Sequence, residues 1–346
     1  MALKLLWSNL MKYIQNIELK KINFKVYKIK SADIIESKFV PDKIVKYIRE
    51  NIKYKYIVRY KYLDNNIYLE YFSKDKINTK IFSIIIKRII FMMIISNTYK
   101  SLNIYIYDTP FKKKFSCNNH KKCGNLTHNN VNSGMSYLNN VIIFRKEEYL
   151  KLLVHELIHA LDIDYKYETN DDKKNIFKIF AVNSNNLLLN ESYVETWAII
   201  INVFLVLYEK NKYGSITEKN IDLFKKYINK ELLHGIEQCS KLCKYYNITN
   251  FDDIYKKNKD TKKYKDDVNT FSYHIIKTIN LYNINNFLKN FKDSKYVMKS
   301  SYNFNTYILF IKKYHTIIIN KINIAMKKLK YPKNKDLEGL TMSCVN

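Results

Sequence analysis

Residues 152–162 carry H-E-x-x-H inside an apolar run, and this stretch constrains the chain more than any other. On an α-helix, residues four apart point the same way, so His155 and His159 place two imidazoles on one face, within reach of one Zn²⁺. Glu156 can hold a carboxylate beside such a metal without binding it and take a proton from water as a general base. The alternative is a buried helix that merely carries two histidines. The apolar neighbours argue against this alternative, because without a metal they would leave His155, Glu156 and His159 buried and unpaired.

A catalytic zinc site needs a third protein ligand and one open position. Glu191 and Glu195 lie four residues apart in residues 189–198, which we expect to form a buried helix. Both carboxylates would then point toward one place. Two inward carboxylates require a cation nearby, so this acidic pair is the candidate source of the third ligand.

Together these two motifs resemble the gluzincin metallopeptidases, in which a Glu on a second helix downstream of H-E-x-x-H completes the zinc site. The resemblance implies that Glu191 is the third ligand and that Glu195 orients His155, although the two roles can be exchanged. It also implies that a Tyr or His from the helical half stabilises the oxyanion. Tyr273 and His274 are the first candidates for this oxyanion donor, and His234 is the second choice. Taken alone, the sequence around each is also that of an ordinary core or surface residue.

A wider resemblance covers residues 80–280. These residues are similar to proteins of large DNA viruses that are assigned as metallopeptidases, through three segments: 132–134, 141–149 and 269–274. This resemblance implies a viral protein acting in the host cytoplasm.

The formal net charge of +28 would ordinarily suggest a nucleic-acid or membrane partner. However, the 346 residues include only 5 Gly and 3 Pro and are rich in Lys, Asn, Ile and Tyr, which a mutational bias toward AT-rich codons produces. Phosphate-binding proteins favour Arg, and the lysines here are scattered. We therefore expect no specific nucleic-acid partner, and a peptide or protein substrate instead.

Cysteine use indicates a reducing compartment, hence an intracellular, cytoplasmic protein, because the 5 Cys form no dense framework. Cys117, His120, Cys123 and His128 could form a small structural zinc site, but their spacing matches no common zinc finger, so we expect a loop with free thiols. We identify no secretory signal and no transmembrane segment. The longest apolar run, residues 81–95, is interrupted by charges and is too short to span a bilayer, so it predicts a buried helix.

The predicted fold is α+β and zincin-like, with a mixed α/β N-terminal half, a helical C-terminal half and the active cleft between them. We expect three regions: an α/β region (1–110), a catalytic core (111–210) and a helical lobe (211–346). Residues 141–144 predict an edge strand just before the zinc helix, and residues 111–140 a long polar loop. Helical patterns cover residues 221–233, 236–246, 270–282, 284–291 and 307–329.

The sequence therefore predicts a zinc-dependent peptidase in which Glu156 is the general base. The alternative is a catalytically inactive zincin-fold protein that serves as a binding or structural module. Intact Glu156 argues against this alternative, because a structural zinc has four protein ligands and no need of a carboxylate beside a water.

Overall fold

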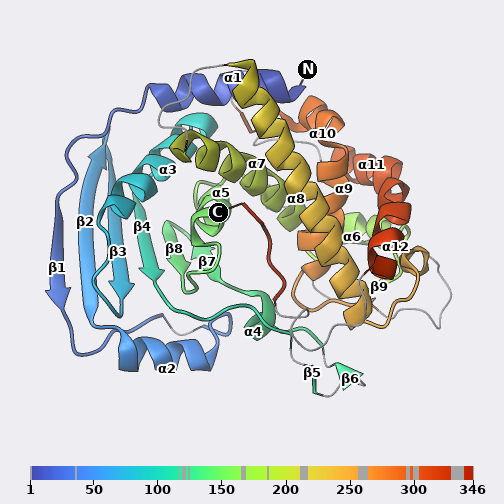
Figure 1. Cartoon of the computed structure of the whole chain (residues 1–346), viewed down its shortest axis with the longest axis horizontal. Helices are drawn as coiled ribbons and strands as arrows, with labels where there is room; N and C mark the ends of the chain where they lie inside the picture. The colour runs from blue at the N-terminus through green and yellow to red at the C-terminus, as the bar shows by residue number, and fades with distance from the viewer. Residues whose placement is uncertain are drawn as a thin grey trace.

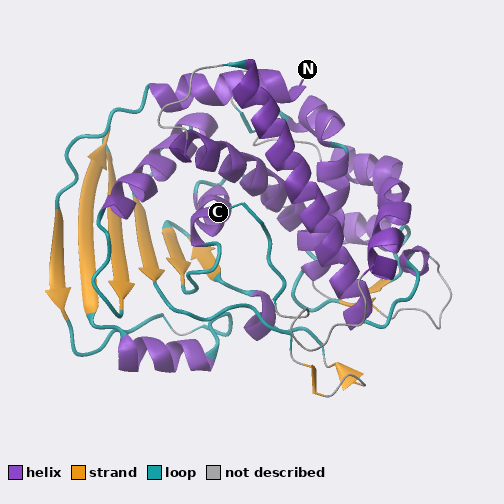
Figure 2. Ribbon diagram, in the orientation of Figure 1, coloured by secondary structure: helices purple, strands orange, loops and turns teal. Residues whose placement is uncertain are grey.

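The computed structural model describes the chain except for residues 1, 36, 116, 119–121, 124, 165–168, 185–186, 211–216, 256–263, 294–296, 299–303, 329–338 and 346. The described part combines a six-stranded mixed sheet with a helical second half (Figures 1 and 2). The prediction of a mixed α/β front half and a helical back half is confirmed at this level.

The sheet has the strand order β1-β2-β3-β4-β8-β7. Its strands are β1 (Phe24–Lys28), β2 (Tyr54–Tyr62), β3 (Asn65–Ser73), β4 (Leu102–Tyr107), β7 (Gly134–Tyr137) and β8 (Asn140–Ile143). The β3–β4 and β4–β8 pairs are parallel, and the other neighbours are antiparallel. Strands β2 and β3 form a hairpin whose turn falls at Leu63 and Asp64, where Leu63 has a φ of 52°.

Helices cover both faces of the sheet. The predicted buried helix α3 (Lys80–Ser96) connects the parallel strands β3 and β4 and packs against the helix that carries H-E-x-x-H. Helix α2 (Asp42–Asn51) begins after Pro41 and buries Ile44 and Ile48 in a smaller core with Phe144. A much larger core extends from α1 (Ala2–Gln15) to the last described residues of the chain.

The edge strand was predicted wrongly. Residues 141–143 belong to the interior strand β8, which lies between β4 and β7, and β7 forms the edge. Strand β7 and the short helix α4 (His128–Val131) both fall in the predicted polar loop. Gly134 opens β7 where a Cβ atom would lie 2.9 Å from the Ile142 carbonyl oxygen and 3.0 Å from a Leu152 methyl carbon, so glycine lets β7 lie close to both neighbours.

Two helices form the centre of the molecule. Helix α5 (Tyr149–Ala160) carries the H-E-x-x-H motif, and α7 (Asn190–Lys210) packs directly against it (Figure 1). Helix α7 is long and apolar enough to cross a membrane, but 94% of its apolar window is buried inside the protein. It is therefore packed as a core helix that is buried on nearly all sides.

The helical half is built around α8 (Glu218–Tyr245), a single helix where the sequence predicted two. A Cβ atom at Gly235 would lie 2.6 Å from Thr278 Oγ1, so this glycine allows α8 to approach α9 without breaking α8. The other helices are α6 (Asn170–Phe177), α9 (Lys277–Tyr282), α10 (Ile284–Phe291), α11 (Phe304–Tyr314) and α12 (Ile319–Lys328). Short strands complete the described elements: β5 (Cys117–Asn118), β6 (Lys122–Cys123), β9 (Val182–Asn183) and β10 (Tyr264–Lys265).

Candidate metal centre

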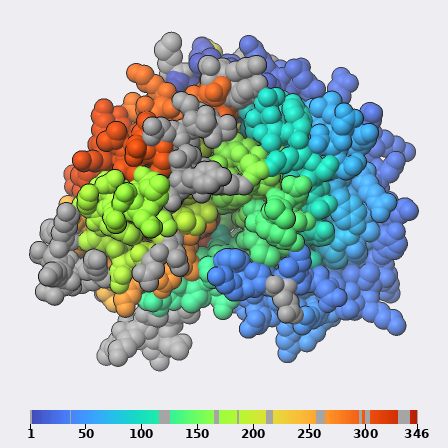
Figure 3. Space-filling model, turned by 180° about the vertical axis from the view of Figure 1, so that it is seen from behind, coloured from blue at the N-terminus to red at the C-terminus, as the bar shows by residue number. Residues whose placement is uncertain are grey.

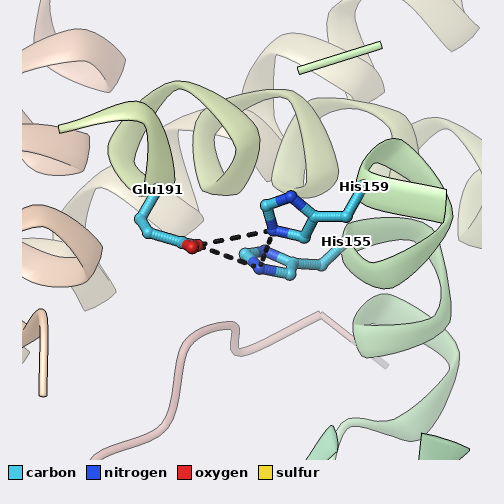
Figure 4. Close-up of side chains that lie close together, drawn as sticks. All are labelled: His155, His159 and Glu191. Atoms are coloured by element: carbon cyan, nitrogen blue, oxygen red, sulfur yellow. Dashed lines mark hydrogen bonds and ion pairs between the residues drawn. The ribbon is translucent and has the colours of Figure 1, made fainter. Parts of the chain in front are cut away.

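The two histidines of α5 and one carboxylate of α7 converge on a single point (Figure 4). The Nε2 atoms of His155 and His159 lie 3.3 Å apart. Glu191 Oε2 lies 3.4 Å from Nε2 of His155 and 3.5 Å from Nε2 of His159. The three predicted metal ligands are thus brought together by two helices that are about thirty residues apart in the sequence.

These distances fit a tetrahedral zinc ion. Zinc binds His nitrogen and carboxylate oxygen at about 2.0–2.1 Å, so neighbouring ligand atoms of a tetrahedron lie about 3.3–3.4 Å apart. Glu191 Oε2 is buried and has no hydrogen-bond partner among the described residues. A buried carboxylate oxygen without a donor is costly, and a cation at the centre of the triangle would satisfy it.

His155 is oriented by Glu195. Its Nδ1 atom lies 2.9 Å from Glu195 Oε2, which leaves Nε2 free to face the centre of the site. Burial alone would raise the pKa of Glu195, but the charge of Lys151 and the hydrogen bond with His155 outweigh it and lower the pKa to about 2. Of the two carboxylates on α7, Glu191 therefore faces both Nε2 atoms and Glu195 faces Nδ1 of His155, rather than the reverse.

His159 is oriented by Asp164, which the sequence analysis missed. Asp164 Oδ2 lies 2.8 Å from His159 Nδ1 and also accepts a hydrogen bond from the Asn190 side chain at 3.1 Å. After α5 ends, Asp162 adopts a φ of 54°, and the chain turns so that Asp164 reaches back to the motif. The only sequence signal is an acidic residue shortly after H-E-x-x-H, because the turn itself cannot be read from the residues.

Glu156 and Tyr273 border the same site. Glu156 is largely buried, with 6% of its surface exposed, and lines the pocket in front of the histidines. Tyr273 lies on a π-helical turn, Phe271–Ile276, lines the same pocket, and has its ring centroid 5.9 Å from that of His155. Burial, together with the charges of Glu191 and Glu156, raises the pKa of Tyr273 well above its usual value, so the phenol keeps its proton.

The other two oxyanion candidates do not line this pocket. His274 is fully buried, and neither of its ring nitrogens has a hydrogen-bond partner among the described residues. Burial and the charges of Lys277 and Lys113 lower the pKa of His274 well below its usual value. His234 donates to the Thr341 carbonyl oxygen at 3.2 Å, and burial lowers its pKa to about 4. Of the three candidates, the structure places only Tyr273 beside the metal ligands.

The site opens into a pocket of about 420 Å³ between strand β7 and the helical half. From behind, the molecule is hollowed where green and yellow-green segments of the chain meet (Figure 3). Met135, Ser136 and Tyr137 of β7 form one wall. His128 and Phe39, whose rings meet edge to face at 4.8 Å, also line the pocket, and neither was predicted to do so.

The predicted cysteine loop can be compared only in part. The side chains of Cys117, His120 and Cys123 lie outside the described residues. His128, the fourth member of that pattern, lines the pocket, and burial lowers its pKa.

Comparison with known proteins identified no relative. No protein-family model matches the chain, and no curated protein and no solved structure matches it. The chemistry of the site therefore follows from its own side chains and distances.

Proposed function

We propose that this protein is a zinc-dependent peptidase of the gluzincin type, with a zincin-like fold. The observation that carries the proposal is the triangle of His155 Nε2, His159 Nε2 and Glu191 Oε2, whose sides of 3.3–3.5 Å suit one tetrahedral zinc ion. Both imidazoles have Nδ1 against a carboxylate, which fixes the tautomer that presents a lone pair at Nε2. The resemblance to viral metallopeptidases is part of the same proposal.

The residues around the triangle supply the other parts of a hydrolytic site. When bound there, zinc would polarise a water and lower its pKa toward neutrality. Glu156 is the general base that accepts a proton from the attacking water and delivers it to the leaving amine. The Tyr273 hydroxyl, beside Glu191, donates a hydrogen bond to the carbonyl oxygen as negative charge develops on it.

The open edge of the sheet supports a peptide as substrate. Strand β7 has β8 as its one neighbour in the described sheet, and all four of its residues line the pocket beside the proposed metal ligands. An extended peptide can pair with such an edge through its main chain, so that it lies across the site. Main-chain pairing favours peptides over small esters, because it fixes the peptide on both sides of the bond to be cut.

A mixed peptide library compared between wild type and Glu156→Gln tests the proposal. The glutamine has nearly the shape of the glutamate but cannot accept the proton of the water, so kcat should fall by a factor of about 10² to 10⁴ while metal content stays the same. Equal turnover by the two proteins would exclude Glu156 as the base. No turnover by zinc-loaded wild type would favour the alternative, a catalytically inactive zincin-fold binding or structural protein.

A further inference from the structure

Residues 341–345, within the last described stretch of the chain (339–345), are largely buried, although Cys344 is exposed, and they form neither a helix nor a strand. In Figure 1 they lie in the red segment that runs inward past α8 and ends near α5. We call them the interior segment. Its carbonyl groups are held by buried side chains: Lys277 donates to the Met342 oxygen at 3.1 Å and Asn202 donates to the Val345 oxygen at 2.8 Å.

Two buried carboxylates hold the N–H groups of the interior segment. Glu148 accepts from Met342 at 3.1 Å and from the next residue, Ser343. Glu231 accepts from Val345 at 2.9 Å. These bonds use charged groups that are buried, so displacing the segment would leave buried charges short of partners.

Glu148 also belongs to a line of alternating charges that ends at the metal site. It precedes α5 and pairs with Lys113 at 2.9 Å. One turn further along α5, Lys151 interacts electrostatically with Glu148, and its ammonium group donates to both carboxylate oxygens of Glu195. Glu195 in turn accepts the Nδ1 hydrogen of His155. Lys151 is only 1% exposed, and its charge is otherwise unused by the proposed reaction.

We propose that Lys151 is a positioning residue for the metal ligand His155, and that the interior segment, acting through Glu148, holds Lys151 in place. The inference rests on the proposed function to the extent that the His155 site binds a metal. Lys151 fixes both oxygens of Glu195, so the oxygen that accepts from His155 stays in one position. Because Glu195 then holds the imidazole in one orientation, Nε2 is aimed before the metal arrives, which raises metal affinity.

Metal affinity, rather than activity, tests the role of Lys151. Lys151→Met removes the ammonium group while keeping an unbranched apolar chain, and should weaken Zn²⁺ binding about ten to a hundredfold in a chelator competition. Leu10→Ala is the control for general loss of stability, because buried Leu10 lies on α1, which packs against α3, α8 and α10. It should bind Zn²⁺ as wild type does. If Lys151→Met does not fold, Lys151→Gln, which keeps a donor for Glu195 without the charge, takes its place.

A matched pair of proline substitutions tests the role of the interior segment. Met342→Pro removes the backbone N–H that donates a hydrogen bond to Glu148. Cys344→Pro removes a nearby backbone N–H that donates to Glu231 instead. Met342→Pro should weaken Zn²⁺ binding several-fold more than Cys344→Pro. Equal effects of the two prolines would overturn the link from the segment to the metal site. Unchanged affinity in Lys151→Met would overturn the positioning role itself, while a wild type that binds no metal would instead refute the proposed function.

Discussion

His159 and Asp164 are joined by a 2.8 Å hydrogen bond across the end of α5. The same Asp164 oxygen accepts from Asn190, the residue beside Glu191 at the start of α7. One carboxylate therefore connects α5, which carries the two histidines, to α7, which carries the proposed acidic ligand. Glu195 plays the corresponding part for His155.

We expect Asp164→Asn and Glu195→Gln each to weaken zinc binding about ten to a hundredfold, because an amide does not hold the Nδ1 hydrogen as a carboxylate does. Chelator competition at neutral pH measures the change. Asp171→Asn is the matched control, because Asp171 is exposed and pairs with exposed Lys174 at 3.0 Å. Wild-type affinity in both variants would show that these carboxylates do not orient the imidazoles.

The purified protein should contain close to one zinc per chain, and His155→Ala or Glu191→Ala should remove it. Each variant leaves two of the three ligands, too few to retain the ion against dilution. Elemental analysis after dialysis gives the stoichiometry, with His315→Ala as the control far from the ligands in the sequence. A well-folded wild type without metal would rule out the peptidase. A second zinc that is lost in Cys117→Ser and Cys123→Ser would show that residues 117–128 hold it.

Tyr273→Phe should lower kcat by a factor of about 10² to 10³, the usual cost of one lost donor to an oxyanion. His274→Leu should leave kcat within a few-fold of wild type, because His274 does not line the pocket. Steady-state kinetics on one peptide found in the library separates the two residues. A large loss in His274→Leu with a native melting temperature would reverse the assignment.

Stability should decrease in mild acid because of His274. Its pKa is lowered well below 6.5 in the folded protein by burial and by Lys277. As the pH falls below about 6.5, His274 becomes protonated in the unfolded chain but stays neutral in the folded protein. The free energy of unfolding therefore declines by up to about 1.4 kcal/mol per pH unit. Urea unfolding at several pH values measures this slope. It should be shallower in His274→Leu, and identical slopes would contradict the assignment.

The parts of the site that were predicted from the sequence lie on long periodic helices. His155, Glu156 and His159, and likewise Glu191 and Glu195, occupy helical spacings within apolar runs, so both the helices and the faces of these residues could be read. Asp164 could not, because its position depends on the left-handed turn at Asp162 rather than on any periodicity.

Short elements and buried charges were missed for different reasons. Strand β7 has four residues, too few to show an alternating pattern, and its place at the sheet edge depends on pairing with β8. Lys151 reads as a solvent-facing lysine at the start of α5, yet it is buried against Glu195. The sequence predicted two helices, 221–233 and 236–246, whereas Gly235 lets the single helix α8 lie close to Thr278. In each case a contact distant in the sequence decides the outcome.

Helix α7 supplies two of the acidic groups of the site from a segment that has almost no solvent-facing side. Because this helix is surrounded by the core, we expect the amides in its middle to exchange with deuterium slowly, and the carboxylates near its start are carried on this stable unit. Loss of the metal would then leave their backbone in place. The empty site would be ready to bind again without a refolding step.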